Sequence, residues 1–287
     1  MSRLDPMMPC DTAFRIVARR YLGEMAAHHQ AACKGDPEAV HQMRVALTHL
    51  RAALLFFRPM IVDSEQIRIK GEVKWLNGHL GAARDLDVAI QRLEATAKSQ
   101  TRAVSDYQPW YVSRAENHRR LARELRSTRY RRLVKTTSDW IESGPWSIRK
   151  GKQAKKQRAC PIATYAASKL ARWQRKVLKR SRKLPKMSAE KRHRLRLLNK
   201  RLSYSTEFFE DLNSDKRISE QLAALKYLRK AQRALGQLND DANSHSLSAT
   251  LLQQGAPAPL PLLGPKREKR LLRTAVAAYR KLAARQP

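Results

Sequence analysis

Hydrophobic residues recur every three or four positions along almost the whole chain, with polar residues between them. On an α-helix this spacing gathers the hydrophobic side chains on one face. The pattern predicts helices over residues 12–34, 37–60, 64–82, 84–98, 104–133, 161–183, 188–212, 215–236, 239–252 and 266–285. Because the strict alternation typical of strands is nearly absent, the predicted fold class is all-α.

Several of the predicted helix ends coincide with residues that favour the start or the interruption of a helix. Asp36 followed by Pro37 is typical of a helix start, because proline suits the first turn, and Ser188 precedes another predicted start. The basic stretch over residues 144–161 is interpreted as a linker. Four prolines within residues 255–265 predict an extended loop before the last helix.

Two sequence patterns occur twice, in the same order. A segment that begins HQMR at His41 is followed by LGAARD at Leu80, and a segment that begins HRLR at His193 is followed by LGQLND at Leu235. Such a duplication predicts two pseudo-symmetric helical bundles joined by a linker. The predicted parts are a first helical repeat over 1–143, a basic linker over 144–160 and a second helical repeat over 161–287.

Both copies place a histidine and basic residues on one stripe of a helix, beside its hydrophobic face. These basic stripes are His41, Arg44 and Arg51 in the first copy, and His193, Arg196 and Lys200 in the second. At the position of Arg51 the second copy has Ser203. The recurrence indicates an anion site, since histidine can donate to a phosphate oxygen. The alternatives are solvated cations without a ligand, and histidines that fix one helix to another.

The helix predicted before His193 carries cations at every third or fourth position. This cationic rail, about 21 Å long at 1.5 Å per residue, consists of Lys169, Arg172, Lys176, Lys179 and Lys183. Concentrated positive charge of this kind is relieved by a bound polyanion.

The Leu-Gly segments are expected to allow close helix approach or to break the helix. Acidic residues follow them, namely Asp85, Asp87, Asp240 and Asp241, and Arg84 of the first copy becomes Asn239 in the second. We expect these acids to pair with arginines of a neighbouring helix. The alternative is that they organise a metal ion or water.

The charge balance requires an anionic partner. The 287 residues include 59 Lys+Arg against 25 Asp+Glu, for a net charge of +34, and the 42% hydrophobic residues indicate a folded protein. Aromatic residues at 6% and only 10 glycines argue against β-barrels and glycine-looped nucleotide folds.

Cysteine usage and the N-terminus bear on the compartment. Cys10, Cys33 and Cys160 are too widely spaced for a disulfide framework or a zinc site, which favours a reducing compartment. The N-terminus has no hydrophobic signal region, so a cytoplasmic protein is expected.

Catalytic signatures are absent from the sequence. There is no H-E-x-x-H, no G-x-x-x-x-G-K-[ST], no G-x-S-x-G and no dense carboxylate cluster for Mg²⁺. We therefore expect that the protein is not an enzyme and that it needs neither a cofactor nor a metal ion.

The repeated residues resemble the CHAD domain, the conserved-histidine α-helical domain, over residues 12 to about 283. The first copy reads H-x-x-R-x6-R and LG-x-x-RD-x-D, and the second reads H-x-x-R-x3-K-R-x2-Y-x2-E and LG-x-x-ND. The resemblance implies two antiparallel bundles around a basic cavity that binds inorganic polyphosphate. In stand-alone members called phosins it also implies association with polyphosphate or polyhydroxyalkanoate granules. Tyr204 and Glu207 would brace the site.

The predicted function is non-catalytic binding of inorganic polyphosphate in a Lys/Arg/His-lined groove. The predicted binding residues are His41, Arg44, Arg51, Lys74, Arg84, Lys169, Arg172, Lys176, Lys179, His193, Arg196, Lys200, Lys226 and Arg229. The alternative is a non-specific nucleic-acid-binding protein, which the lack of aromatic residues within the stripes disfavours. A phosphatase or kinase acting on polyphosphate would need acids that the stripes lack.

Overall fold

A computed structural model describes residues 3–97, 108–253 and 264–285, without the side chains of 96–97 and 240–253. The all-α prediction is confirmed, because within these ranges there are helices and no strand. An isolated antiparallel bridge joins Pro9 to Pro161. Most of the predicted loop over 255–265 and the side chains of Asp240 and Asp241 lie outside the described residues.

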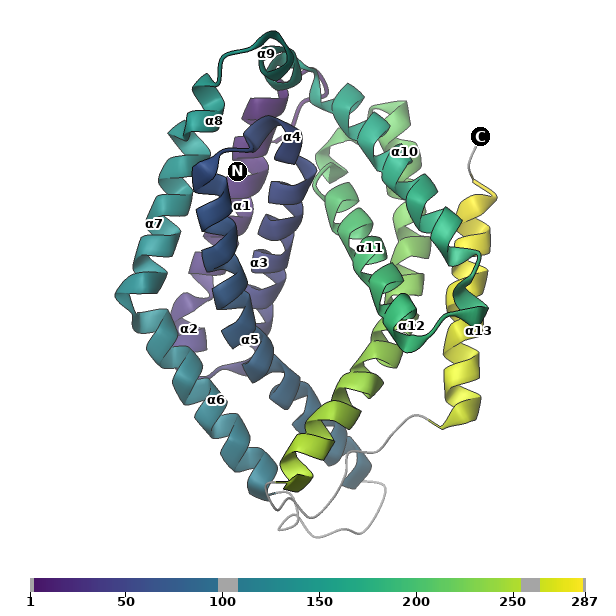
Figure 1. Cartoon of the computed structure of the whole chain (residues 1–287). Helices are drawn as coiled ribbons and strands as arrows, with labels where there is room; N and C mark the ends of the chain where they lie inside the picture. The colour runs from purple at the N-terminus through teal and green to yellow at the C-terminus, as the bar shows by residue number, and fades with distance from the viewer. Residues whose placement is uncertain (1–2, 98–107, 254–263, 286–287) are drawn as a thin grey trace. The chain divides into compact units, whose positions relative to one another are not determined.

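The chain divides into two compact units (Figure 1). Unit 1 contains residues 11–159 and the end of the long helix α12 from Ser248. Of the remaining described residues, unit 2 contains 3–10, 160–247 and 264–285. The boundaries of the predicted repeats and the predicted duplication itself stay predictions.

Unit 1 contains helices that the hydrophobic periodicity predicted, together with α8 and α9, which it did not predict. They are α1 (Cys10–Ala27), α2 (His29–Cys33), α3 (Pro37–Phe56), α4 (Arg58–Ile61), α5 (Ser64–Ala97), α6 (Gln108–Arg126), α7 (Thr128–Ser143), α8 (Pro145–Ile148) and α9 (Lys152–Ala159). Helix α5 packs on α3, α6 and α7. It therefore holds the largest part of unit 1 together.

Capping explains where α3 begins. The Asp36 carboxylate accepts hydrogen bonds from the backbone N–H groups of Glu38 (2.8 Å) and Ala39 (3.3 Å), and Pro37 occupies the first turn. These contacts satisfy backbone donors that have no partner within the helix. Gly35, just before the cap, has a φ of 84°, which a glycine adopts without strain. The predicted start at Asp36-Pro37 is confirmed.

The two Leu-Gly segments do not interrupt their helices. The prediction of separate helices over 64–82 and 84–98 is wrong, because α5 continues through Gly81. Leu80, Ala83 and Leu86 keep the buried periodicity across the glycine. Burial of these side chains outweighs the cost of a glycine in a helix interior, about 1 kcal/mol. Helix α12 likewise continues through Gly236, so the predicted break there is also wrong.

The segment predicted as a linker carries helices α8 and α9. Trp146 of α8 is fully buried, and its indole N–H donates to the Trp140 carbonyl at 2.8 Å. The Asp63 carboxylate accepts from the backbone N–H of Trp146 (3.1 Å) and from the Trp140 indole. A single large aromatic residue therefore anchors a stretch whose charge indicated a linker. Helix α9 buries none of its residues.

The predicted helix over 104–133 is divided at Ser127. The Ser127 hydroxyl accepts from the backbone N–H of Tyr130 at 3.2 Å and caps α7, which then extends to Ser143. Phe14 of α1 packs edge-on against Trp146 at a ring distance of 5.1 Å, and also contacts Phe57 and Trp140. These aromatic side chains form one end of the core of unit 1.

Unit 2 consists mainly of long helices. They are α10 (Ile162–Ser181), α11 (Ala189–Glu207), α12 (Lys216–Gln253) and α13 (Pro265–Ala283), with short 3-10 turns η2 (Leu184–Lys186) and η3 (Glu210–Leu212). Helix α10 packs on α11 and α13. The Ser188 hydroxyl caps α11 by accepting from the Lys191 N–H at 3.4 Å, which confirms that predicted start.

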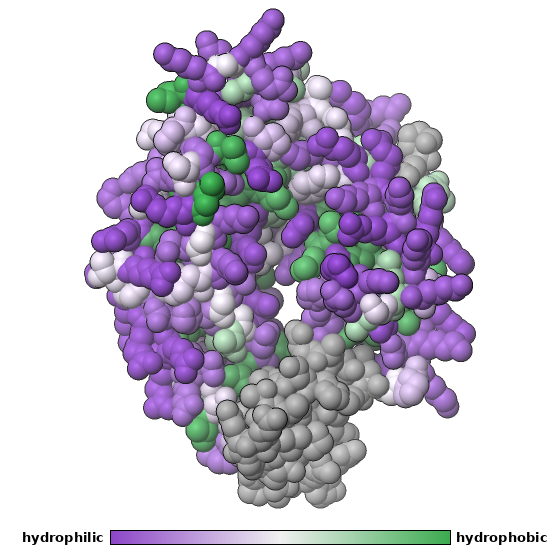
Figure 2. Space-filling view, viewed as in Figure 1, coloured by the Kyte–Doolittle hydropathy of each residue, from purple (hydrophilic) through white to green (hydrophobic). Residues whose placement is uncertain are grey.

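The surface is mostly hydrophilic. Figure 2 shows polar and charged residues over most of the described surface in view, with small hydrophobic areas between them. Among the side chains that the structure describes, the large hydrophobic ones that are exposed are Met7, Ile67, Val112 and Ile148. Within the described residues, no helix has the length and hydropathy required to cross a membrane.

Candidate anion-binding site

The basic stripe of the first copy lies on α3 at the edge of its buried face. Met43, Leu47 and Leu50 are buried, whereas His41 and Arg44 are partly exposed and Arg51 is exposed. The stripe therefore borders the core, as the periodicity predicted.

Unit 1 brings its two repeated patterns together, because α3 packs against α5. The Arg44 Nη2 lies 4.0 Å from the Asp85 Oδ1, and both side chains are substantially exposed, at 35% and 51%. An exposed pair at this distance contributes little and leaves the guanidinium available to another anion. Arg84 is the neighbour of Asp85 on α5, and Lys74 lies ten residues earlier, about 15 Å along the helix.

The second acid of the α5 segment has a structural role. Asp87 is buried, and its Oδ1 accepts from the Arg114 Nε (2.7 Å) and the His118 Nε2 (2.9 Å), both on α6. Burial raises the pKa of Asp87, but the hydrogen bonds from His118 and Arg114 outweigh it, so this pKa lies below its ordinary value. The expected pairing with an arginine of a neighbouring helix is confirmed for Asp87.

Unit 2 sets its own two patterns side by side on α11 and α12. The His193 Nδ1 hydrogen-bonds with the Asn239 Oδ1, and the Arg196 Nε lies 4.0 Å from the place where a Cβ of Gly236 would stand. His193 is exposed and Arg196 is half-exposed. In each unit, therefore, the histidine-arginine helix meets the Leu-Gly helix.

Other predicted residues of unit 2 have partners of their own. The Lys200 ammonium lies over the Tyr204 ring at 5.4 Å, and the Lys226 ammonium over the Tyr227 ring at 5.0 Å. Arg229 donates to the carboxylates of Glu207 (3.0 Å) and Glu210 (3.3 Å). The two acids neutralise part of the charge of Arg229, so it braces α12 against the end of α11.

The cationic rail on α10 is exposed except at its first member. Arg172, Lys176, Lys179 and Lys183 face solvent, whereas Lys169 is buried and donates to the Tyr165 hydroxyl at 2.9 Å. Burial, and then repulsion by Arg172, lower the pKa of Lys169 to about 8. The prediction of a continuous rail is therefore wrong at Lys169. At that turn the helix faces the core, where Tyr165 and Trp173 enclose the ammonium.

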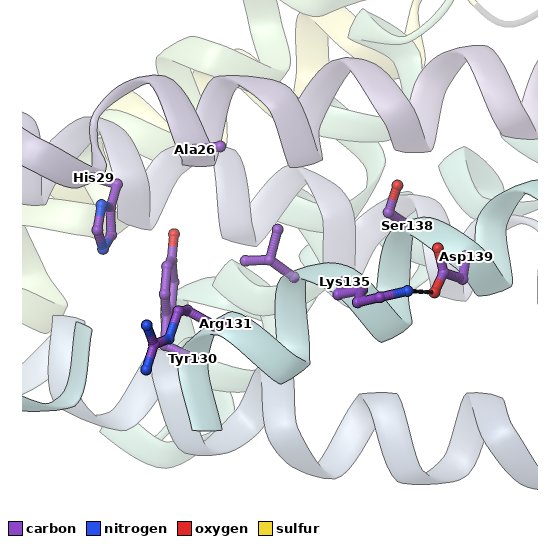
Figure 3. A pocket seen from close by; sticks show the side chains of 8 residues that line it. Ala26, His29, Tyr130, Arg131, Lys135, Ser138 and Asp139 are labelled. Carbon is purple, nitrogen blue, oxygen red and sulfur yellow. Dashed lines mark hydrogen bonds and ion pairs between the residues drawn. The ribbon is translucent and has the colours of Figure 1, made fainter. Parts of the chain in front are cut away.

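A separate pocket lies in unit 1 between α1–α2 and α7 (Figure 3). It is lined by Ala26, His29, Tyr130, Arg131, Val134, Lys135, Ser138 and Asp139. The His29 and Tyr130 rings stack at 4.8 Å, and burial raises the pKa of Tyr130 to about 12. Lys135 donates to Asp139 at 2.7 Å, which neutralises one of the pocket's cations. No predicted anion-binding residue lines this pocket.

Metal binding finds no support in the part of the chain that the structure describes. Within it, no group of three or more His, Cys, Asp or Glu side chains is placed to hold a metal ion.

The chain is all-α, and in each unit a basic histidine-arginine helix packs against a Leu-Gly helix. This arrangement defines the class of protein to which the chain belongs. The family model of the CHAD domain matches residues 16–249, so the chain belongs to the CHAD-domain family. The crystal structure of the CHAD domain from the plant Ricinus communis is similar, with 25% identity and a TM-score of 0.73, over 100% of this chain and 90% of that one.

A second solved structure supports the fold alone. PptA from Streptomyces chartreusis has 15% identity and a TM-score of 0.61, over 96% of each chain. No curated protein matches the sequence significantly.

The sequence analysis did not predict several buried polar residues that form hydrogen bonds between helices. His118 follows Asp87 by 31 residues, and Asn199 bonds with Tyr279 across 80 residues. Neither pair follows a local spacing rule. The repeated Arg and His residues could be found because they recur.

Proposed function

We propose that this protein binds inorganic polyphosphate without catalysis, through the basic stripes of α3 and α11 together with the exposed part of the cationic rail. The observation that carries the proposal is that each unit places its stripe against its own Leu-Gly helix, at Arg44 and Asp85 in unit 1 and at Arg196 and Gly236 in unit 2. CHAD domains are generally non-catalytic binding domains and are often linked to polyphosphate or triphosphate binding.

The charge of the chain favours a long polyanion. A net charge of +34 on 287 residues remains after every acidic residue has been counted. Arginine donates two parallel hydrogen bonds to phosphate, and lysine adds point charges along the chain. Binding of successive phosphates releases counterions, so affinity should fall steeply as salt rises.

Of the predicted residues, we retain for this proposal His41, Arg44, Arg51, Lys74, Arg84, Arg172, Lys176, Lys179, His193, Arg196, Lys200 and Lys226. Lys169 is omitted because its ammonium is buried and hydrogen-bonded to Tyr165, and Arg229 because two carboxylates hold it. The groove between the two stripes stays a prediction.

A competition titration tests the ligand. Labelled long-chain polyphosphate is bound at about 150 mM salt, where the Debye length of about 8 Å reduces long-range attraction, and is then challenged with single-stranded DNA, RNA and short phosphate oligomers. Retention of polyphosphate against a large charge excess of nucleic acid supports the proposal. Displacement at equal charge would favour the nucleic-acid alternative.

A charge-reversal pair tests the residues. Arg44→Glu combined with Arg196→Glu should abolish binding while the helical circular dichroism stays unchanged. The matched control is Arg123→Glu with Arg280→Glu, which changes the net charge equally on exposed positions of α6 and α13. Equal losses in both double variants would mean that bulk charge alone binds the polyanion.

Association with polyphosphate granules follows from the same binding. A fluorescent fusion should colocalise with polyphosphate granules in cells that accumulate them, and the Arg44→Glu and Arg196→Glu variant should be dispersed. Granule localisation that survives this variant would require another docking surface.

A further inference from the structure

Two cysteines far apart in the sequence lie directly opposite each other in unit 2. The backbone N–H of Cys10 donates to the Cys160 carbonyl at 3.0 Å, and the N–H of Ile162 donates to the Met8 carbonyl at 2.9 Å. These two bonds flank the antiparallel bridge between Pro9 and Pro161. Cys10, the first residue of α1, and Cys160 therefore face each other beside this bridge, and one backbone hydrogen bond joins them into a short ladder.

The ladder gives the spacing that a disulfide needs. Facing residues of an antiparallel pair that share a hydrogen bond have Cα atoms about 5.5 Å apart. Disulfides occur at Cα separations of about 4.4–6.8 Å. Facing side chains of such a pair also project from the same side of the ladder. Both residues are thiols in the structure, and Cys33 of unit 1 is a third.

A neighbouring tyrosine interacts electrostatically with both cysteines. Burial raises the pKa of Tyr165 well above its ordinary value, and the adjacent Cys10 and Cys160 thiols raise it further. A single hydroxyl group is thus close enough to both thiols to sense their charge. This agrees with side chains that converge from the ladder toward α10.

The surroundings give the two thiols different roles. Cys10 is fully buried, whereas Cys160 is partly exposed and can meet an oxidant first. Lys169 donates to the Tyr165 hydroxyl at 2.9 Å and interacts electrostatically with Cys10.

We propose that Cys10 and Cys160 are a redox-sensitive pair that a low-molecular-weight disulfide converts into an intramolecular disulfide. The Cys160 thiolate attacks the disulfide R–S–S–R, forms a mixed disulfide and releases one R–S⁻. The Cys10 thiolate then attacks the Cys160 sulfur and releases the second R–S⁻. Overall, two protein thiols lose two electrons and two protons, and R–S–S–R is reduced to two R–SH.

The position of the pair gives the bond a consequence. The chain passes from unit 2 into unit 1 directly after Cys10, and returns to unit 2 at Cys160. A disulfide would join these two crossings and close a loop that contains almost the whole of unit 1. Closing a long loop restricts the unfolded chain and raises resistance to unfolding.

The test uses the full-length protein, equilibrated in glutathione buffers of increasing oxidised fraction. Remaining thiols are alkylated and counted by mass spectrometry, and peptide mapping locates the disulfide. We expect two of the three thiols to disappear together, a Cys10–Cys160 peptide to appear, and Cys33 to stay alkylatable. The apparent melting temperature should rise on oxidation and return to its reduced value on reduction.

Variants separate the steps. Cys33→Ser is the matched control and should oxidise like the wild type. Cys10→Ala should accumulate one glutathione adduct on Cys160, and Cys160→Ser should lose both the adduct and the disulfide. The wild-type measurement does not depend on the folding of these variants. Three alkylatable thiols at the highest oxidised fraction, or a disulfide that involves Cys33, would overturn the proposal.

Discussion

Helices α3 and α11 carry the same histidine-arginine pattern, yet different forces hold them in their units. The buried face of α3 is almost entirely apolar, with Leu47, Ala53 and Leu54 at three of its positions. At the corresponding positions α11 buries polar residues, namely Asn199, Ser205 and Thr206. The packing of α3 rests on apolar contact, whereas α11 combines apolar contact at Leu195 and Leu202 with the interhelical hydrogen bonds of Asn199.

Asn199 shows how the polar face works. It is fully buried, its Nδ2 donates to the Leu228 carbonyl of α12 at 2.9 Å, and its Oδ1 accepts from the Tyr279 hydroxyl of α13 at 3.1 Å. One side chain thus links three helices, and these bonds fix the position of α11 along α12. Apolar contact alone would specify this position less strictly.

The comparison shows that similar helices can be packed with different buried residues. The two copies share the histidine and arginine of the stripe, and they also share buried residues such as Leu50 and Leu202, whereas several other buried positions differ. Packing can be achieved by either set of buried residues.

Breaking the polar link of α11 should have the largest effect. Asn199→Ala removes two hydrogen bonds and leaves the Tyr279 hydroxyl and the Leu228 carbonyl buried, so unfolding should become easier by about 3 kcal/mol. Urea denaturation followed by circular dichroism measures this loss.

Tyr279→Phe provides the control for Asn199. In the Asn199→Ala background it should cost less than in the wild type, because the hydroxyl that it removes has already lost its partner. Equal costs in both backgrounds would show that the Asn199–Tyr279 bond contributes nothing.

The Asp87 cluster of unit 1 has no acidic counterpart in the second copy, where Ala242 takes the corresponding position. Asp87→Asn should lower stability at pH 7 by about 2 kcal/mol, since it weakens hydrogen bonds to a charged group. The folded pKa is lowered from 3.8, so this stabilisation is fully present above pH 3.8 and is lost as the pH falls through the folded value.

Urea denaturation at pH 7 and pH 3 checks the Asp87 prediction. The difference between wild type and Asp87→Asn should shrink at pH 3. Asp85→Asn is the control, because the Asp85 side chain is 51% exposed and solvent screens its interactions, so a small effect is expected at both pH values. A difference that does not change with pH would argue against an ionised Asp87.

Hydrophobic periodicity could predict most helices because their buried faces are apolar. The prediction failed where the packing of particular residues outweighed the local sequence pattern. The glycine at position 81 indicated a break, yet the buried residues around it continue the helix, and Trp146 folds a stretch that its charge marked as a linker.

The candidate site could be predicted only as far as its residues repeat. The stripes recur, so they could be identified without the structure. Lys169 looked equal to the other cations of the rail, since a sequence does not show which turn of a helix faces the core. Asn199 was missed because the sequence does not show whether an asparagine is buried or exposed.

Ser203 of α11 and Arg51 of α3 occupy corresponding positions but differ in burial. It corresponds to the exposed Arg51 but is itself buried at 1% exposure, and its hydroxyl has no hydrogen-bond partner among the described residues. Ser203→Arg should therefore destabilise the protein by about 1.5 kcal/mol through overpacking rather than strengthen binding.

Thermal unfolding and polyphosphate titration test the Ser203 prediction together. Ser203→Ala should leave both properties unchanged, and Arg51→Ser should weaken binding with little effect on stability. Tighter binding by a fully stable Ser203→Arg protein would mean that this position opens to solvent.

The smallest expected effect concerns Asn239, which takes the place of Arg84. Asn239→Arg adds a cation to the second copy and removes the acceptor of the His193 hydrogen bond. Each additional phosphate contact steepens the dependence of log affinity on log salt by about 0.7–0.9. Polyphosphate titrations across a salt series should therefore give a steeper slope and a severalfold higher affinity at low salt. Asn213→Arg, on an exposed position outside the stripes, adds the same charge and should leave the slope almost unchanged. If both variants shift the slope equally, total charge decides binding, and the difference between the two copies has no bearing on the ligand.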